Sequence, residues 1–195
     1  MPLQLKRFES GEHTFLWLEH VHACLNNLGL TFLWHTQSVS ENVFKNMVKQ
    51  RLKDQYIQTW TNEINMNNIC YNYRMFKTEF KFEQYLINLE RPLRDYMLKF
   101  RLSNHKLPIH SQRFLGIRRD ERLCEICETG EIGDEFHYLF NCRNERIVQE
   151  RIKNLNTYFL YRPNVVKYQS LMNAKSKVKQ KKLARFFGLI LSKFR

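Results

Sequence analysis

Apolar residues recur at steps of three and four positions along much of the chain, which is the spacing of one face of an α-helix. The clearest stripe predicts a long amphipathic helix over residues 40–64, and the capping-box spacing of Ser38 and Glu41 marks its start. The apolar members of this stripe are Val43, Phe44, Met47, Val48, Leu52, Tyr56, Trp60 and Ile64.

Further helical segments precede and follow this stripe. Residues 13–36 predict a helix, a turn near Asn26, Asn27 and Gly29, and a short second element. Two of the other predicted helices span residues 78–89 and 144–161. Another begins at Pro92 and stops before Pro108, and its inward residues are Leu93, Tyr96, Met97 and Phe100. The last is a tail helix from Ala174, whose apolar face consists of Leu183, Phe186, Phe187, Ile190 and Phe194.

The composition agrees with a mainly α-helical fold. With 6 Gly and 4 Pro in 195 residues, the chain has too few turn residues for a many-stranded sandwich or barrel. Its 15 Phe, 9 Tyr and 3 Trp exclude disorder as a description of the whole chain. We expect four parts, which are a poorly defined segment (1–40), a helical domain with a basic linker (41–119), a module whose three cysteines and one histidine are the residues of a zinc-binding site (120–146), and C-terminal helices with a basic tail (147–195).

The strongest chemical signal is a set of three cysteines and one histidine. Cys124 and Cys127 are separated by two residues, nine residues separate Cys127 from His137, and four separate His137 from Cys142. Two thiolates at this spacing can face one ion from a tight knuckle, and the second pair completes a tetrahedron. Three thiolates and one imidazole suit Zn²⁺, and because all four positions are filled we expect one structural zinc per chain. The alternative is a scatter of buried cysteines and a core histidine.

The spacing of His137 and Cys142 sets a geometric condition. Five residues of an α-helix turn through about 500°, so the two side chains cannot share one face of a regular α-helix. We therefore predict a short helix that the acidic residues 134–135 begin, that carries His137 and that ends near Phe140. Asn141 in the left-handed conformation then turns Cys142 back toward the metal.

The net charge of +13 is concentrated in two basic blocks. Residues 91–119 hold 8 basic and 1 acidic residues and residues 162–195 hold 10 basic and none acidic, whereas residues 120–161 hold 5 and 9. Blocks of one sign favour a polyanionic partner, with a solvated helix face as the ordinary alternative for the first block. The residues that we expect to contact phosphates are Arg101, Lys106, Arg113, Arg118, Arg119, Lys177, Lys181, Lys182 and Arg185.

The residues of common catalytic chemistry are missing from the sequence. Two-metal polymerases and nucleases need clustered carboxylates, whereas the chain has four separated aspartates. It also has no Gly-rich phosphate loop, HExxH or GxSxG motif, so we expect no enzymatic activity. No apolar stretch is long enough for a membrane span and the start resembles no signal peptide. We therefore expect an intracellular protein, in the nucleus or the cytoplasm, whose five cysteines are free or metal-bound.

Part of the chain resembles the region that follows the polymerase domain in the polyproteins of non-LTR, LINE-like retrotransposons. The residues that carry this resemblance are FKTEFKFEQYL, LRDYMLKFRLSNHKLPIHSQRF, ERLCEICETGEIGDEFHYLFNC with the following NERIVQER, and the tail SLMNAKSKVKQKKLARFFGLILSKFR. The resemblance covers roughly residues 41–195 and is most specific over residues 74–146.

The resemblance implies a helical segment that leads into a small CCHC zinc-binding module. It implies that Cys124, Cys127, His137 and Cys142 are the metal ligands, and Arg101, His105 and Arg113 match recurrent basic positions of the linker. A retroviral-type knuckle has four residues before its histidine where this chain has nine, so the base-stacking roles of that smaller motif are not transferred. The polymerase and endonuclease domains are absent, so a complete chain of this kind would be a relic, a domesticated accessory protein or a fragment.

The leading hypothesis is a zinc-stabilised nucleic-acid-binding module whose partner is RNA or DNA, single-stranded or structured. Phe114, His105 or Tyr138 are the candidates for stacking on unpaired bases, although an aromatic side chain beside arginines is more often packed. If roughly six phosphates are engaged, binding should fall about as the fifth power of the salt concentration.

Two other hypotheses remain open. The first is a structural or protein-interaction domain, a retroelement relic without a nucleic-acid role of its own, which docks through helices 40–64 and 78–101, for example on a reverse transcriptase polypeptide. The second, less favoured, places the basic amphipathic tail 174–195 on an anionic membrane.

Overall fold

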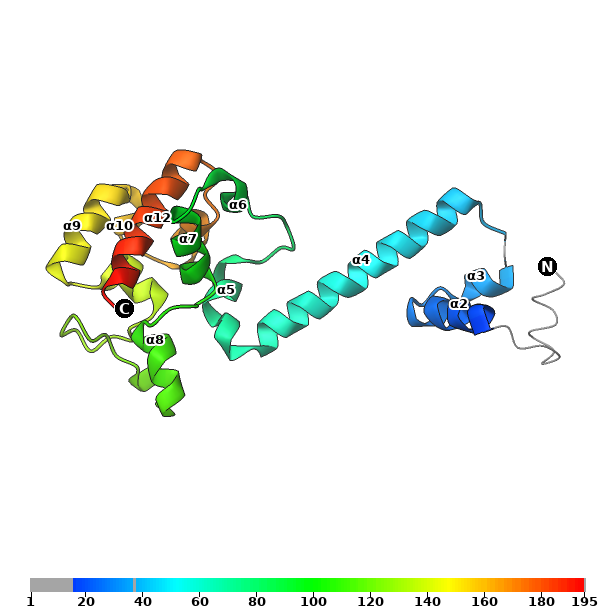
Figure 1. The fold of residues 1–195 in the computed structure, drawn as a ribbon, viewed down its shortest axis with the longest axis horizontal. Helices are drawn as coiled ribbons and strands as arrows, with labels where there is room; N and C mark the ends of the chain where they lie inside the picture. The colour runs from blue at the N-terminus through cyan, green and yellow to red at the C-terminus, as the bar shows by residue number, and fades with distance from the viewer. Residues whose placement is uncertain (1–15, 37, 195) are drawn as a thin grey trace. The chain divides into compact units, whose positions relative to one another are not determined.

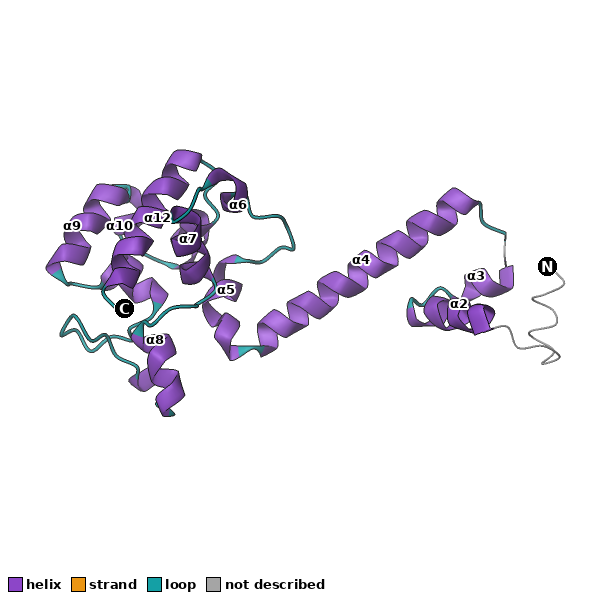
Figure 2. Cartoon of the chain, viewed as in Figure 1, coloured by secondary structure: helices purple, strands orange, loops and turns teal. Residues whose placement is uncertain are grey.

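The computed structural model describes residues 16–36 and 38–194, so residues 1–15 and residue 37 of the predicted N-terminal segment lie outside the described part, as does residue 195. Within the described residues every regular element is helical, with one isolated antiparallel bridge between Leu123 and Ile132 (Figure 2). The predicted mainly α fold class is therefore confirmed. The helices are α2 (Leu16–Asn27), α3 (Thr31–Thr36), α4 (Glu41–Met66), α5 (Tyr71–Phe76), α6 (Tyr85–Asn88), α7 (Leu93–Arg101), α8 (Pro108–Ser111), α9 (Glu145–Asn154), α10 (Thr157–Leu160), α11 (Val165–Met172) and α12 (Lys177–Ser192), with 3₁₀ turns η1 (Asn68–Cys70), η2 (Gln112–Leu115) and η3 (Arg119–Glu121) and a π-helical turn η4 (His137–Asn141) (Figure 1).

The described part of the chain divides into two compact units, the first up to residue 63 and the second from residue 64. The predicted domain divisions after residues 40, 119 and 146 stay predictions. In the first unit, α2 and α3 follow each other through a turn in which Gly29 has a φ of +66°, a left-handed conformation that glycine adopts without strain. The predicted helix, turn and second element in this region are thus confirmed for the described residues. The buried core of this unit consists of Leu18, Leu25, Leu28, Leu30, Leu33 and Trp34.

The long helix α4 confirms the helix predicted from the apolar stripe. Its start differs, because the backbone N–H of Val43 lies 3.5 Å from the Oγ of Ser40, which makes Ser40 rather than Ser38 the capping residue. The apolar stripe of α4 is covered at its first residues and exposed further along the helix. Its first apolar residues, such as Phe44 and Met47, pack against the core of the first unit, whereas Leu52 is 54% exposed. Helical periodicity therefore identified the element but not how much of its face is covered.

The core of the second unit forms where α7 packs against α12. The rings of Phe100 and Phe187 stack there with centroids 3.7 Å apart and an interplanar angle of 7°. Burial of each such side chain contributes about 1.5–3 kcal/mol. Gly188 allows the close approach, since a Cβ at this position would lie 2.7 Å from ring atoms of Tyr96. The predicted apolar face of the tail helix is confirmed, and its members Leu183, Phe186, Phe187 and Ile190 are all buried in this core.

Burial of this face removes the surface that the membrane hypothesis requires. A basic amphipathic helix binds a bilayer with its apolar side, and in α12 that side packs against α7. Among the described residues, no helix is both long and apolar enough to cross a membrane.

The length predicted for the helix at residues 78–89 is wrong, because only its C-terminal part, α6, is helical. Glu83 is instead held outside a helix by its ion pairs with Lys77, at 3.2 Å, and with the Nη2 of Arg101, at 3.1 Å. Phe82, a member of the predicted stripe, is 62% exposed. Long-range ion pairs thus override the local helical spacing of this segment.

The helix predicted at residues 144–161 is interrupted in the structure. α9 ends at Asn154, Leu155 is extended and buried, and the side chain of Asn156 caps α10 by accepting a hydrogen bond from the N–H of Tyr158. Leu155 still belongs to the buried core of the second unit.

Candidate metal centre

The first half of the cysteine and histidine cluster lies on a tight loop that spans residues 122–133. The N–H of Cys124 donates to the carbonyl of Glu131 at 2.9 Å, and the N–H of Gly133 donates to the carbonyl of Arg122 at 2.8 Å. Gly130 makes the return turn with a φ of +67°. A Cβ at Gly133 would lie 3.1 Å from the Cα of Cys124, so glycine at this point lets the two sides of the loop approach.

The second half lies on a short helical segment that Asp134 begins. The Oδ1 of Asp134 accepts a hydrogen bond from the N–H of His137 at 2.9 Å, which confirms the predicted start. The predicted left-handed Asn141 is wrong, because the segment ends in the π-helical turn η4, which includes Asn141, and the N–H of Cys142 donates to the carbonyl of His137 at 2.8 Å. A π-turn bonds residue i to residue i+5, so it brings these two residues to the same side of the helix. The expected spacing problem was therefore real, and a wider helical turn solves it.

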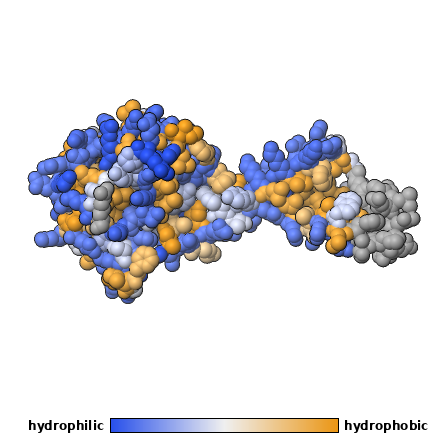
Figure 3. Space-filling view, in the orientation of Figure 1, coloured by the Kyte–Doolittle hydropathy of each residue, from blue (hydrophilic) through white to orange (hydrophobic). Residues whose placement is uncertain are grey.

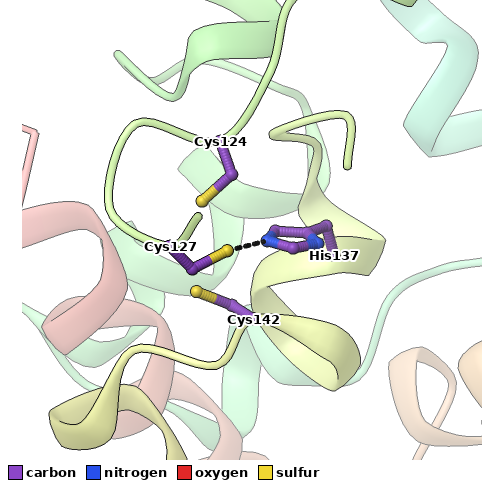
Figure 4. A group of neighbouring side chains, drawn as sticks. All are labelled: Cys124, Cys127, His137 and Cys142. Atoms are coloured by element: carbon purple, nitrogen blue, oxygen red, sulfur yellow. Dashed lines mark hydrogen bonds between the residues drawn. The ribbon is translucent and has the colours of Figure 1, made fainter. Parts of the chain in front are cut away.

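The four side chains point toward one another from these two segments (Figure 4). Their ligand atoms, the Sγ atoms of Cys124, Cys127 and Cys142 and a ring nitrogen of His137, all lie within 4.8 Å of one another. The Nε2 of His137 is 3.2 Å from the Sγ of Cys127. His137 and Cys142 are buried, and the other two cysteines are partly exposed. The four predicted ligand residues thus form one group that could hold a metal ion.

Glu131 orients the histidine of this group. Its Oε2 lies 2.7 Å from the Nδ1 of His137, which leaves the Nε2 directed at the cysteines. Metal-binding histidines commonly use their second ring nitrogen in this way. Glu131 is not among the predicted site residues, and the acidic residues of the nine-residue spacer are the only local signal for it.

Arg151 of α9 supports the end of the same turn. It is buried, and its Nη2 donates to the carbonyl of Tyr138 at 3.1 Å and to that of Cys142 at 2.9 Å. Its charge lies close to the thiol groups and is therefore suited to balance thiolates. No local pattern identifies Arg151, because its contact depends on how α9 packs against η4.

Protons within the cluster are shared unequally. A hydrogen bond from Cys142 lowers the pKa of the Cys124 thiol to about 3, and the same contact raises the pKa of Cys142 above its usual range. Burial lowers the pKa of His137, but hydrogen bonds with Cys124 and Glu131 outweigh it and raise this pKa to about 9. A metal ion needs thiolates and a neutral imidazole, so its binding releases protons and its affinity rises with pH.

Arg101 is buried, and the prediction that it contacts phosphate is wrong. Its side chain is 2% exposed, its Nε and Nη2 each lie 3.1 Å from a carboxylate oxygen of Glu83, and its Nη1 donates to the carbonyl of Met172 at 2.6 Å. The guanidinium also lies over the ring of Phe76, 4.3 Å from its centroid. Three polar contacts and an aromatic face fix this arginine inside the second unit, where phosphate cannot reach it.

The other predicted phosphate-contacting residues differ in accessibility. Arg118 is exposed and pairs with Asp120 at 3.0 Å, whereas Arg119 is partly covered by its contacts with Tyr71 and Asp134. Lys106, Lys177, Lys182 and Arg185 are exposed, and Arg113 and Lys181 are half-buried.

Two of the three predicted stacking residues are inaccessible. Tyr138 is 0% exposed, and the side chain of His105 is 2% exposed with its Nε2 2.9 Å from Glu135. The prediction that these two residues stack on bases is therefore wrong, because both side chains are buried. Phe114 is 72% exposed.

Comparison with models of protein families, with curated proteins and with solved structures finds no match to this chain.

Proposed function

We propose that the chain is a nucleic-acid-binding module stabilised by one structural Zn²⁺ ion. The observation that carries the proposal is the convergence of Cys124, Cys127, His137 and Cys142, whose ligand atoms lie within 4.8 Å of one another. The role proposed for the ion is structural and non-catalytic, because four protein ligands leave no position for water or substrate.

The donor set and its dimensions support zinc. Zinc bonds of about 2.3 Å to sulfur and about 2.0 Å to nitrogen place tetrahedral ligands roughly 3.5–3.8 Å apart. The 3.2 Å between Cys127 and His137 and the limit of 4.8 Å for the group bracket these values. Three soft thiolates and one imidazole favour Zn²⁺ over hard cations such as Mg²⁺ or Ca²⁺. Reduced thiols of this kind agree with an intracellular location, in the nucleus or the cytoplasm.

The position of the centre explains how it would stabilise the module. Tyr138 and Cys142 of the metal segment belong to the same buried core as Phe100 of α7 and Phe187 of α12. An ion that closes the loop at residues 122–133 onto η4 would therefore hold a segment that helps to build this core, and its binding energy would contribute to folding.

Exposed basic side chains of the second unit support the nucleic-acid part of the proposal. Lys106 and Arg118 lie in the first basic block, and Lys177, Lys182 and Arg185 lie on the polar side of α12. Lysine and arginine side chains that contact phosphates release the counterions condensed on the nucleic acid. This release drives binding without sequence specificity. The resemblance to the region that follows the polymerase in non-LTR retrotransposon proteins supports the same proposal, in which RNA or DNA is the partner and a reverse transcriptase polypeptide is a further one.

Native mass spectrometry of the full chain, purified without chelators, tests the zinc centre. We expect one zinc per chain, and Glu131→Ala should weaken zinc binding roughly 10- to 100-fold while the ligands remain. Glu128→Ala, which removes another acidic residue of the same spacer, is the matched control. A metal-free wild-type protein would contradict the centre.

Salt titration of oligonucleotide binding tests the second part. If roughly six phosphates are engaged, the affinity for single-stranded RNA or DNA should fall about as the fifth power of the salt concentration. An affinity that does not change with salt would contradict nucleic-acid binding.

A protein-interaction role is the second candidate, and the exposed apolar residues of α4 favour it. Val43 is 46% and Leu52 is 54% exposed on this helix. Affinity capture with the full chain separates the two functions. Loss of the captured material after nuclease treatment supports nucleic-acid binding, whereas material that resists nuclease and depends on Leu52 supports protein docking.

A further inference from the structure

A groove of about 640 Å³ opens beside α8 in the second unit, between the end of α7, the α8–η2 segment and the last residues of α12. Its volume is in the range of small-ligand sites. The described residues that line it include lysines, histidines and aromatic residues but no aspartate or glutamate. The groove therefore combines positive charge with apolar surface.

Phe114 provides the exposed aromatic surface of this groove. Its side chain is 72% exposed although it belongs to the η2 turn. The ring of His110 meets it edge to face at 5.3 Å, and the guanidinium of Arg113 lies 5.1 Å from its centroid. In the space-filling view, apolar side chains gather at the lower end of the second unit (Figure 3). Contacts from two neighbours hold a large ring that remains mostly open to solvent.

The positive charge of the groove comes from Lys99 and Lys106. Both are exposed, and among the described residues neither forms an ion pair. His105 carries its polar atoms inward, since its Nε2 bonds to Glu135 and its Nδ1 accepts from the N–H of Leu107. The two lysines are therefore free to meet an anion beside the aromatic ring.

His110 completes the floor as a neutral ring. Burial, together with the neighbouring His105 and Arg113, lowers the pKa of His110 below its usual value, against a smaller opposite effect of Glu135. At neutral pH the ring of His110 beside Phe114 is thus uncharged.

We infer that this groove takes one unpaired nucleotide of a single-stranded nucleic acid, with its base stacked on Phe114 and its phosphate beside Lys99 and Lys106. The inference rests on the proposed nucleic-acid binding and names the place on the protein where an unpaired base would bind. Paired bases hide their faces in the duplex, so the groove favours single strands. An acidic peptide would satisfy the lysines but offers no flat ring for Phe114.

Equilibrium binding of the full, zinc-loaded chain to a fluorescent oligothymidylate of about 12 nucleotides tests the inference, with an abasic oligomer of the same length as the second probe. Phe114→Ala should weaken oligothymidylate binding roughly 5- to 150-fold and leave abasic-oligomer binding unchanged. The matched control Leu115→Ala removes the neighbouring side chain, which is 75% exposed, and should change binding less than about twofold. Thermal unfolding and zinc content verify that both variants fold.

The charge of the groove is tested with the same probes. Lys106→Ala should lower the slope of log affinity against log salt by about 1, whereas Lys45→Ala, an equal loss of charge on α4, should not. Equal slopes for the two variants would overturn the role of Lys106.

The remaining outcomes separate the groove from the proposed function. If the wild-type chain binds neither oligomer, nucleic-acid binding and the groove both fail. If the wild-type chain binds oligothymidylate and Phe114→Ala binds as tightly as Leu115→Ala, the groove alone is overturned. Wild-type binding of the abasic oligomer or of oligoglutamate as tight as that of oligothymidylate would show recognition of charge alone and would overturn stacking.

Discussion

Replacing Arg101 with methionine tests the buried ion pair that joins α7 to the segment before α6. Arg101 is 2% exposed, and its partner Glu83 is 13% exposed. The substitution keeps a long apolar side chain over the ring of Phe76 but removes the hydrogen bond and the ion pair to Glu83 and the hydrogen bond to the carbonyl of Met172. Glu83 then keeps Lys77, at 3.2 Å, as its remaining cationic partner among the described residues.

The magnitude follows from the desolvation of the group that remains. Removal of one partner of a buried pair costs about 3–5 kcal/mol, because the other charge stays buried. Lys77 compensates part of the charge of Glu83, so we expect a loss near the lower end, about 3 kcal/mol. With a urea dependence of about 1–3 kcal/mol per M, the unfolding midpoint should fall by roughly 1–3 M. The double variant with Glu83→Gln should lose less than the sum of the two single losses, because neither Arg101 nor Glu83 then remains as a buried charge without the other.

Urea unfolding followed by far-UV circular dichroism measures these losses, and Arg91→Met is the matched control. Arg91 is 77% exposed at its side chain, so its replacement should change the free energy of unfolding by at most about 0.5 kcal/mol. If Arg101→Met instead unfolds at the wild-type midpoint and lowers the salt slope of oligonucleotide binding by about 1, Arg101 contacts phosphate and its burial is refuted.

Two further perturbations test the same unit. Burial raises the pKa of Glu83, but the Arg101 guanidinium and Lys77 outweigh it and hold this pKa below its usual value. The ion pair therefore stabilises the fold at any pH above the unfolded-state pKa of about 4.3. This stability is lost as pH falls through the lower pKa of the folded state. The difference in unfolding free energy between the wild type and Glu83→Gln should therefore shrink from neutral pH toward pH of about 3, and a difference independent of pH would contradict this. Gly188→Ala should destabilise the protein by about 1–3 kcal/mol in urea unfolding, because its Cβ would lie 2.7 Å from the ring of Tyr96 and force α7 and α12 apart. Ser192→Ala on the same helix is the control, and an equal or higher stability of Gly188→Ala would contradict the close contact.

Local spacing was sufficient for the elements whose apolar face became buried as a whole. The tail helix α12 has Leu183, Phe187 and Ile190 in the core, where the stripe of the sequence places them. The same reasoning overestimated residues 78–89, because the pairing of Glu83 with a residue 18 positions later has no local signature. Period and composition report on one element at a time, whereas an ion pair across elements depends on their packing.

The candidate site shows the same division. Ligand type and spacing identified Cys124, Cys127, His137 and Cys142, because the chemistry of a closed tetrahedral site restricts which residues can serve. The wider turn that brings His137 and Cys142 together was not predicted, since a π-turn differs from an α-turn by one residue per hydrogen-bonded ring. Glu131 completes the arrangement through a contact that forms only when the loop closes.

The sequence by itself determined that this protein is mainly helical, that one group of four residues has the chemistry of a metal site, and that its positive charge lies in two blocks. It could do so because helical period, ligand type and charge are properties of residues and their spacing. Only the tertiary structure decided which basic and aromatic residues are accessible. Arg101 and Tyr138 became part of the core while Phe114 stayed exposed, because burial depends on which helices pack over a residue and not on its neighbours in the chain.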